Sequence, residues 1–321
     1  MNFDLLITNL TNPAFLFFVL GIVAVQLKSD LAIPESSSKF IALYLLLSIG
    51  FKGGQELSGE VFSSEIVWSI LFGIVLSLAI PVYTFFILKR KLNVFDAGAI
   101  AAAYGSVSAV TFVTAVSYLE FQKLELNGHM VAIMALMESP AIIAGLALIT
   151  MYGEKEELPG INRKKVIGHS FTNGSVLLIV GSLIIGFLAD AKQAEGIKPF
   201  TNDIFKGFLA IFLLDMGINS GKKLGTFLSH GWFPLLFALF IPLVNGALAA
   251  ILSGFITDST ADRFMFAILA SSASYIAVPA AMKIAVPQAN AGLYGPMALA
   301  VTFPFNITAG MPIYLIICEA T

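Results

Sequence analysis

The sequence predicts an all-α polytopic membrane protein of about ten transmembrane helices, arranged as a 5+5 inverted repeat with two broken crossing helices. Three observations lead to this fold class: an apolar composition, ten apolar stretches of roughly membrane-spanning length, and an internal repeat. Each half of the repeat holds an odd number of spans, and this forces the second half into the opposite orientation.

The composition excludes most soluble proteins. Of the 321 residues, 58% are hydrophobic and 12% are charged, and the mean hydropathy is +0.89. Soluble domains carry about 25% charged residues, so this chain has too little polar surface to coat a globule in water. The net charge of −2 provides no basic surface for nucleic acid, which is therefore not expected as a partner.

Apolar stretches define the expected helices in order, because a span of a bilayer needs about 20 apolar residues. The N-terminus has no basic segment of the kind that precedes a cleaved signal, so we expect the first stretch to remain as a permanent span. The expected spans are 13–28, 36–52, 65–88, 96–117, 129–152, 168–190, 203–219, 230–256, 262–284 and 292–318.

The distribution of basic residues orients these spans. With the N-terminus outside, 12 of the 18 Lys and Arg residues fall in inside loops and 6 fall outside. Basic residues are enriched in cytoplasmic loops. The sequence therefore predicts that both termini lie outside and that the polar loop 153–167 lies inside.

An internal repeat divides the chain. Three segments recur in the same order, namely Leu45–Leu57 over Phe212–Leu224 at an offset of 167, the stretch from Asp96 over that from Asp262 at 166, and Met134–Leu136 over Met297–Leu299 at 163. We therefore expect a first repeat over 1–152 with spans 1–5, a cytoplasmic linker over 153–167, and a second repeat over 168–321 with spans 6–10. This architecture is typical of secondary transporters.

The repeat-matched spans 96–117 and 262–284 are both interrupted near the middle. The first contains Tyr104–Ala109, read as YGSVSA, and the second contains Ala270–Ser274, read as ASSAS, with Pro279 following. Glycine lowers the cost of leaving helical geometry, and proline removes a backbone donor. Unwound backbone is tolerated at membrane depth only against protein or a water-filled cavity, so both breaks point to a binding site.

The breaks suggest how a small anion is held. A half-helix that begins near the membrane centre presents unpaired N–H groups and a partial positive charge, and serine hydroxyls add donors. The alternative is that these small residues only allow close helix packing. The candidate substrate-binding residues are Gly105, Ser106, Val107, Ser108, Ser271, Ser272, Ala273 and Ser274.

Ionisable residues inside spans are costly and indicate function. Glu138 lies mid-span before a proline, and Thr302 and Asn306 lie at the matching place in the second half. With Thr111, their oxygens are suitable ligands for Na⁺. Glu138 is alternatively a proton carrier or a protonated acid bonded to a neighbouring helix. Asp215 is a second exception, with bonding to Asn219 or exposure beside Lys222 as its simpler interpretations.

Other chemistry is not supported. The three histidines stand at span starts without metal-ligand spacing, and we interpret them as interface anchors. No phosphate-binding loop is present. An intramembrane hydrolase using Ser106 or Ser108 would need a base within reach, and no histidine lies mid-span. We therefore expect no catalytic residue, no enzyme activity and no cofactor, with Na⁺ as the coupling ion.

Nearly the whole chain resembles the sodium-dependent bicarbonate transporter family, the SbtA-type permeases. The segments that carry this resemblance are PAFLFFVLGIVAVQL, SIGFKGG, YGSVSAVT, LMESPAII, LASSASYIAVP and VPQANAGLYG. The resemblance implies a gate domain and a core domain, elevator-like motion, a homotrimer in the bacterial plasma (inner) membrane, and control by a PII-like cytoplasmic protein.

These observations predict a secondary active transporter that couples Na⁺ to bicarbonate or a similar small anion. Two carriers of the same architecture remain as alternatives, a Na⁺/H⁺ antiporter and an organic-anion symporter. A channel is a further alternative, although the inverted repeat and the absence of a filter motif argue against it.

Overall fold

The computed structural model describes residues 13–153 and 174–321, and the secondary structure within these residues is helical throughout. Six of the described helices are long and apolar enough to cross a membrane, which confirms a polytopic helical membrane protein. They are Ser64–Leu88, Val94–Phe121, His129–Tyr152, Ala191–Gly225, Trp232–Phe255 and Ala291–Ala320; Phe15–Gln26 and Gly174–Leu188 are shorter apolar helices.

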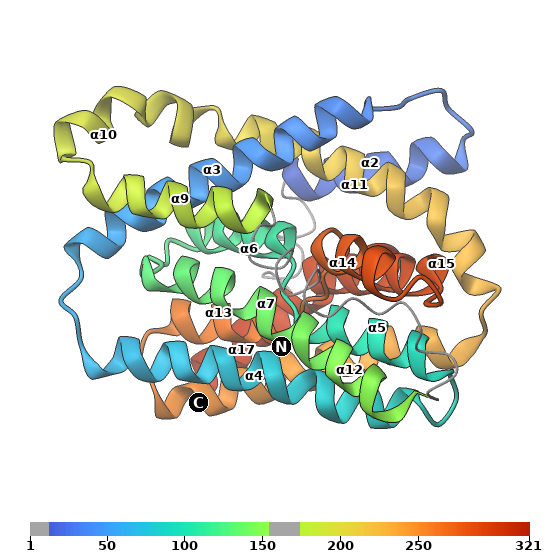
Figure 1. Cartoon of the computed structure of the whole chain (residues 1–321). Helices are drawn as coiled ribbons and strands as arrows, with labels where there is room; N and C mark the ends of the chain where they lie inside the picture. The colour runs from blue at the N-terminus through green and yellow to red at the C-terminus, as the bar shows by residue number, and fades with distance from the viewer. Residues whose placement is uncertain (1–12, 154–173) are drawn as a thin grey trace.

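The helices form two layers, seen along the upper edge and in the lower part of Figure 1. The first, which we call the scaffold layer, contains α2 (Pro13–Gln26), α3 (Glu35–Gly59), α9 (Gly174–Leu188), α10 (Ala191–Lys198) and α11 (Phe205–Leu228). The second, the core layer, contains α4 (Ser64–Leu88), α5 (Val94–Gly105), α6 (Ala109–Phe121), α7 (His129–Tyr152), α12 (Trp232–Leu252), α13 (Thr260–Ser271), α14 (Ala277–Ala285), α15 (Ala291–Pro296) and the last segment. That segment runs through η3 (Met297–Thr302), α16 (Phe303–Phe305) and η4 (Asn306–Gly310) into α17 (Met311–Ala320). Each layer takes helices from both halves of the sequence.

Glycines bring the scaffold helices into backbone contact. A methyl group at Gly186 of α9 would meet the Phe51 carbonyl of α3, and one at Gly217 of α11 would meet the Phe18 carbonyl of α2. Small residues at a membrane interface let two backbones approach closely. The scaffold is therefore two tight helix pairs, α3 with α9 and α2 with α11.

The core layer is built around two short, almost fully buried helices. In α5 and α13 nearly every residue is buried, as expected for helices that are apolar on all sides. Asn93 caps α5 by accepting from the Asp96 N–H at 2.8 Å, and Ser259 caps α13 by accepting from the Asp262 N–H at 3.3 Å. The two caps and the two aspartates lie at the same sequence offset, 166.

The breaks predicted at 104–109 and 270–274 interrupt the helices of the core layer. Helix α5 ends at Gly105, and α6 resumes at Ala109; α13 ends at Ser271, and α14 resumes at Ala277. The residues that follow the first halves have nearly the same extended backbone, with φ −84° and ψ 165° at Ser106 and φ −78° and ψ 163° at Ser272. These positions also differ by 166.

Three details differ from the expectation. Helices α3 and α11 extend past the predicted ends 52 and 219, to Gly59 and Leu228. In the extension of α3, Gln55 donates to the Ala189 carbonyl at 2.9 Å. Helix α10 was not expected, although the Asp190–Gln193 capping box that starts it can be read in the sequence. The predicted linker 153–167, apart from Gly153, lies outside the described residues.

Candidate substrate and ion site

The two helix breaks are hydrogen-bonded to each other. The Ser108 backbone N–H donates to Ser272 Oγ at 3.0 Å, and the Ser274 N–H donates to the Ala103 carbonyl at 2.8 Å. These residues are separated by more than 160 positions in sequence. The structure thus brings the two predicted halves of the anion site together at one point of the core layer.

The helix starts at the breaks are partly capped from within. Ser108 Oγ accepts from the Thr111 N–H at 3.2 Å, and Ser274 Oγ accepts from the Val278 N–H at 3.3 Å. The N–H groups of Ala109 and Ala277, at the first positions of α6 and α14, have no acceptor within their own helices. Both half-helices therefore present backbone donors, and the positive ends of their dipoles, at the breaks.

A cavity of about 540 Å³ lies between the scaffold and core layers beside the breaks. Val107, Ser108 and Ser274 line it from the breaks, and Glu138 lines it from α7. From the scaffold layer, α3 and α11 contribute Ser38 and Asp215 among others. The cavity is large enough for a small hydrated anion together with a cation. Three of the predicted anion-binding residues and one predicted cation ligand thus line the same cavity.

The other candidate anion ligands are buried behind the cavity wall. Gly105 packs against the Pro81 ring of α4, where a side chain would clash. Ser106 Oγ is buried and has no hydrogen-bond partner among the described residues, and Ser271 Oγ donates to the Ile268 carbonyl at 3.3 Å. Ser272 Oγ accepts from the Ser108 N–H and so holds the Ser108 backbone in place. Ala273, between Ser272 and Ser274, is also buried.

Among the four candidate cation ligands, Glu138 alone lines the cavity. Its side chain is 6% exposed, and Oε1 has no hydrogen-bond partner within the described residues. An unpartnered buried carboxylate oxygen is costly, and a bound cation would offset this cost. In the described part of the chain, no three His, Cys, Asp or Glu side chains gather as a metal site, so other ligands would be hydroxyl, carbonyl or amide oxygens.

The remaining cation candidates lie in the core layer next to the breaks. Thr302 Oγ1 is 2.7 Å from the Tyr104 hydroxyl and donates to the Ala238 carbonyl at 2.8 Å. Asn306 Nδ2 donates to the Ser271 carbonyl at 2.9 Å. Thr111 is buried on the first turn of α6. In this conformation Thr302 and Asn306 already have protein partners, and they hold the ends of α5 and α13 in place.

Sequence reasoning missed part of the cavity wall. Asp215 is an ionisable exception whose simpler interpretations are a bond to Asn219 or exposure beside Lys222. It is only 4% exposed, and its carboxylate accepts from Ser38 Oγ at 2.5 Å. Asn219 does bond Asp215, although through the backbone carbonyl, at 3.0 Å. Ser38 stands early in a predicted span, and no pattern in the sequence indicates its partner in α11.

The interpretation of all three histidines as interface anchors is wrong for His129. Its side chain is buried, and Nδ1 lies 2.8 Å from Glu60 Oε2. His230 is exposed, as expected, and His169 lies outside the described residues. A position at a helix start does not place His129 at a membrane interface, because Glu60 in the connection between α3 and α4 lies against its ring.

Comparison with known proteins gives a family match over nearly the whole chain. A family model described as the Na⁺-dependent bicarbonate transporter superfamily matches residues 13–319, nearly the whole chain. No curated protein matches the sequence. On the basis of the family match, the chain belongs to the Na⁺-dependent bicarbonate transporter superfamily.

Proposed function

We propose that the protein is a secondary active transporter that couples the entry of Na⁺ to uptake of bicarbonate or a similar small anion. The observation that carries this proposal is the hydrogen-bonded pair of helix breaks, Ser108 with Ser272, at the wall of a cavity between two helical layers. Membership of the superfamily supports the choice of anion and coupling ion.

The proposed architecture for this activity is ten spans in a 5+5 inverted repeat, with one repeat in 1–152 and the other in 168–321. In the proposed repeat, α2 corresponds to α9, and α3 corresponds to α11. The symmetry therefore maps the contact between α3 and α9 onto the contact between α11 and α2, and both contacts are present. The matching backbone at Ser106 and Ser272 supports the same symmetry.

Bicarbonate would be held by dipoles and hydroxyls rather than by a cationic side chain. No Lys or Arg lies within the two breaks. The first-turn N–H groups of α6 and α14, with the Ser108 and Ser274 side chains beside them, are the available donors. An anion held in this way is bound without a buried counter-charge, which permits its release after transport.

Na⁺ would bind on the carboxylate side of the same cavity. Glu138 Oε1 is the free ligand, and the carbonyl ends of α5 and α13 direct their negative dipole ends toward the breaks. Thr111, Thr302 and Asn306 complete the proposed set if their present hydrogen bonds rearrange. A bound cation neutralises Glu138 and so lowers the repulsion that the anion meets, which links the two binding steps.

We further propose that the core layer moves against the scaffold layer as an elevator. The cavity reaches Glu35, Lys39 and Lys223, at helix ends that the distribution of basic residues places on the cytoplasmic side. The described conformation is then open to the cytoplasm, with both termini outside, in the bacterial inner membrane. On the opposite side, Lys52 of the scaffold layer pairs with Glu120 of the core layer at 2.6 Å.

Two proposed partners rest on the family resemblance alone. One is the chain itself, in a homotrimer, and the other is a PII-like cytoplasmic protein. The loop predicted to face such a regulator, 153–167, lies almost entirely outside the described residues. Mass measurement of the purified protein in lipid nanodiscs tests the trimer.

Uptake of labelled bicarbonate into proteoliposomes, with and without an inward Na⁺ gradient, tests the proposed function. We expect accumulation only with the gradient. Absence of Na⁺-dependent accumulation would contradict the proposal.

A Na⁺/H⁺ antiporter is the second candidate, because Glu138 is a buried carboxylate, unpartnered within the described residues and suited to proton exchange. Proton flux driven by Na⁺ without any anion would favour it.

A further inference from the structure

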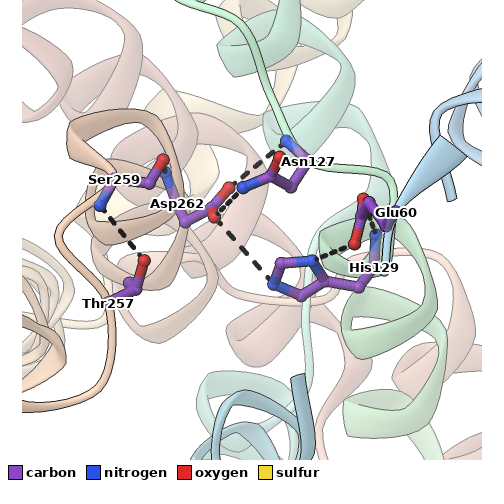
Figure 2. A network of polar contacts seen from close by, with 6 residues as sticks. All are labelled: Glu60, Asn127, His129, Thr257, Ser259 and Asp262. Atoms are coloured by element: carbon purple, nitrogen blue, oxygen red, sulfur yellow. Dashed lines mark hydrogen bonds and ion pairs between the residues drawn. The ribbon is translucent and has the colours of Figure 1, made fainter. Parts of the chain in front are cut away.

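A cluster of polar side chains surrounds His129, as Figure 2 shows. The cluster lies beside the end of α3, whereas the cavity mouth lies at the start of that helix. We call it the His129 clamp and define it as Glu60, Asn127, His129 and Asp262. Glu60 follows α3 in the connection between the scaffold and core layers, whereas His129 and Asp262 stand in the first turns of α7 and α13. The clamp therefore joins the connection to two helices of the core layer.

The carboxylate of Glu60 holds the start of α7 through two contacts. Glu60 Oε1 accepts from the His129 backbone N–H at 3.3 Å, and Oε2 lies 2.8 Å from His129 Nδ1. An ionised carboxylate only accepts hydrogen bonds, so Nδ1 carries a proton. In the neutral imidazole, Nε2 is then the unprotonated nitrogen.

The unprotonated nitrogen faces a second carboxylate. His129 Nε2 lies 3.9 Å from Asp262 Oδ2 and has no hydrogen-bond partner within the described residues. Asp262 is held by the Asn127 amide, which donates at 2.6 Å. A neutral ring turns a lone pair toward this carboxylate, whereas a protonated ring turns an N–H toward it, so protonation converts a repulsive contact into an attractive one.

Comparison of the two repeats shows which contacts of the clamp occur in both halves and which occur in one half only. At the repeat-related place, Asp96 accepts from the Asn290 N–H at 2.6 Å, as Asp262 accepts from Asn127. The positions that correspond to His129 and Glu60 at offsets of 163 and 167 are Gly292 and Phe227. The aspartate–asparagine contact thus serves the fold on both sides, and the titratable histidine pair is added on one side only.

The clamp is positioned to influence the transport site. Glu138 lies nine residues after His129 on α7, and Ser271 lies nine residues after Asp262 on α13. At 1.5 Å per residue, both site residues are about 14 Å from the clamp along rigid helices. The clamp thus links the connection between the layers to the same two helices that carry Glu138 and Ser271.

We propose that His129 is a positioning residue that makes transport sensitive to pH on the proposed outer face. This inference rests on the proposed function. In acid, the imidazolium bridges Glu60 and Asp262 and holds the connection against the core layer, which slows the exchange between conformations. In alkali, the neutral ring releases Asp262, and exchange speeds up. Glu60 from the connection and Asp262 from α13 are the charged groups that face the ring; Asn127, Ser259 and Thr257, from the connections before α7 and α13, are uncharged.

The test is the dependence of uptake on external pH between about 6 and about 8, where histidine charge changes, at a fixed bicarbonate concentration and a fixed internal pH. We expect uptake by the unmodified protein to rise about fivefold, the lower end of a typical coupling between sites. His129→Asn keeps a donor near Glu60 but cannot titrate, so its uptake is expected to be fast and flat with pH. The exposed His230→Asn is the matched control and keeps the original profile. A His129→Asn profile that still rises would overturn the proposal.

A second variant and a second measurement keep the test informative. Asp262→Asn removes one carboxylate that stabilises the imidazolium, so the midpoint of the uptake–pH curve is expected to move to lower pH. An unchanged midpoint of that curve contradicts the clamp. Alkylation of a cysteine at Ala42 in the cavity, with Cys318→Ala as background, follows the conformation without any substrate. We expect labelling to increase in acid, and to lose this dependence in His129→Asn. This readout distinguishes failure of the clamp from failure of bicarbonate transport.

Discussion

The backbone N–H of Ser108 donates a hydrogen bond to Ser272 Oγ across 3.0 Å, which ties the break in the first half of the chain to the break in the second. This bond places two half-helix starts at one cavity wall. It also means that Ser272 supports the site indirectly, because its hydroxyl positions the Ser108 backbone.

Ser272→Ala is expected to lower bicarbonate uptake about tenfold. The change leaves the buried Ser108 N–H without its acceptor, at a cost of about 1–3 kcal/mol, and tenfold corresponds to about 1.4 kcal/mol. Initial uptake rates in proteoliposomes measure the effect. Ser69→Ala is the control, because Ser69 Oγ on α4 is similarly buried but has no partner in the part of the chain that the structure describes. Equal rates in the two variants would remove Ser272 from the site.

Glu138→Gln is expected to raise the Na⁺ concentration for half-maximal uptake at least about tenfold. The amide keeps the shape of the side chain but removes the charge that attracts the cation in a poorly hydrated place. Titration of uptake against Na⁺ measures this, with the exposed Glu319→Gln as the matched control. An unchanged Na⁺ requirement together with lost proton flux would instead support the antiporter.

Gly186→Ala is expected to lower the apparent Tm of the purified protein, whereas Gly181→Ala on the same helix is not. A methyl group at Gly186 meets the Phe51 backbone, but at Gly181 it meets nothing within 4 Å. Overpacking costs about 1–3 kcal/mol, whereas alanine in an open helical position favours the helix by up to about 1 kcal/mol. A thermal shift assay in detergent compares the two, and an equal Tm would argue against close packing of α3 on α9.

Glu120→Gln is expected to reduce cytoplasmic labelling of a cysteine at Ala42. Glu120 on α6 pairs with Lys52 at 2.6 Å and with Lys206 at 3.6 Å, both from the scaffold layer, on the side away from the cavity mouth. Loss of these ion pairs favours the opposite conformation. Partly exposed pairs contribute about 0.2–1 kcal/mol each, so the loss of each pair changes the labelling by at most about fivefold.

The control for Glu120→Gln exchanges the charges. Lys52→Glu with Glu120→Lys restores an ion pair and is expected to restore labelling. High salt is expected to weaken the effect, because the pair is partly exposed and screened. Labelling that is insensitive both to the exchange and to salt would show that Glu120 acts by packing rather than by charge.

Several elements could be predicted from the sequence because they depend on local properties. The apolar stretches of α4 and α7 end where charged or turn-forming residues begin, so their bounds agree closely with the expectation. The breaks were predictable because serine and glycine interrupt two otherwise apolar spans at one sequence offset. Helix α10 carried a readable signal, its capping box, but its low hydrophobicity excluded it from a search for spans.

The partners of buried polar side chains could not be predicted in the same way. Ser38 with Asp215 and Tyr104 with Thr302 are separated by 177 and 198 residues. Local pattern contains no information about such pairs, because their geometry depends on how several helices pack at once. The same limit explains why His129 was taken for a surface residue.

The sequence by itself determined that this protein is a helical membrane protein, because composition and periodicity reflect the solvent that each segment must face. It also predicted that the serines of both breaks and Glu138 lie at membrane depth. Only the tertiary structure decided which of them share a cavity, that Asp215 joins them, and that His129 lies between two carboxylates. The physical reason is that burial and hydrogen bonding between distant helices are properties of the packed chain, and no single segment contains them.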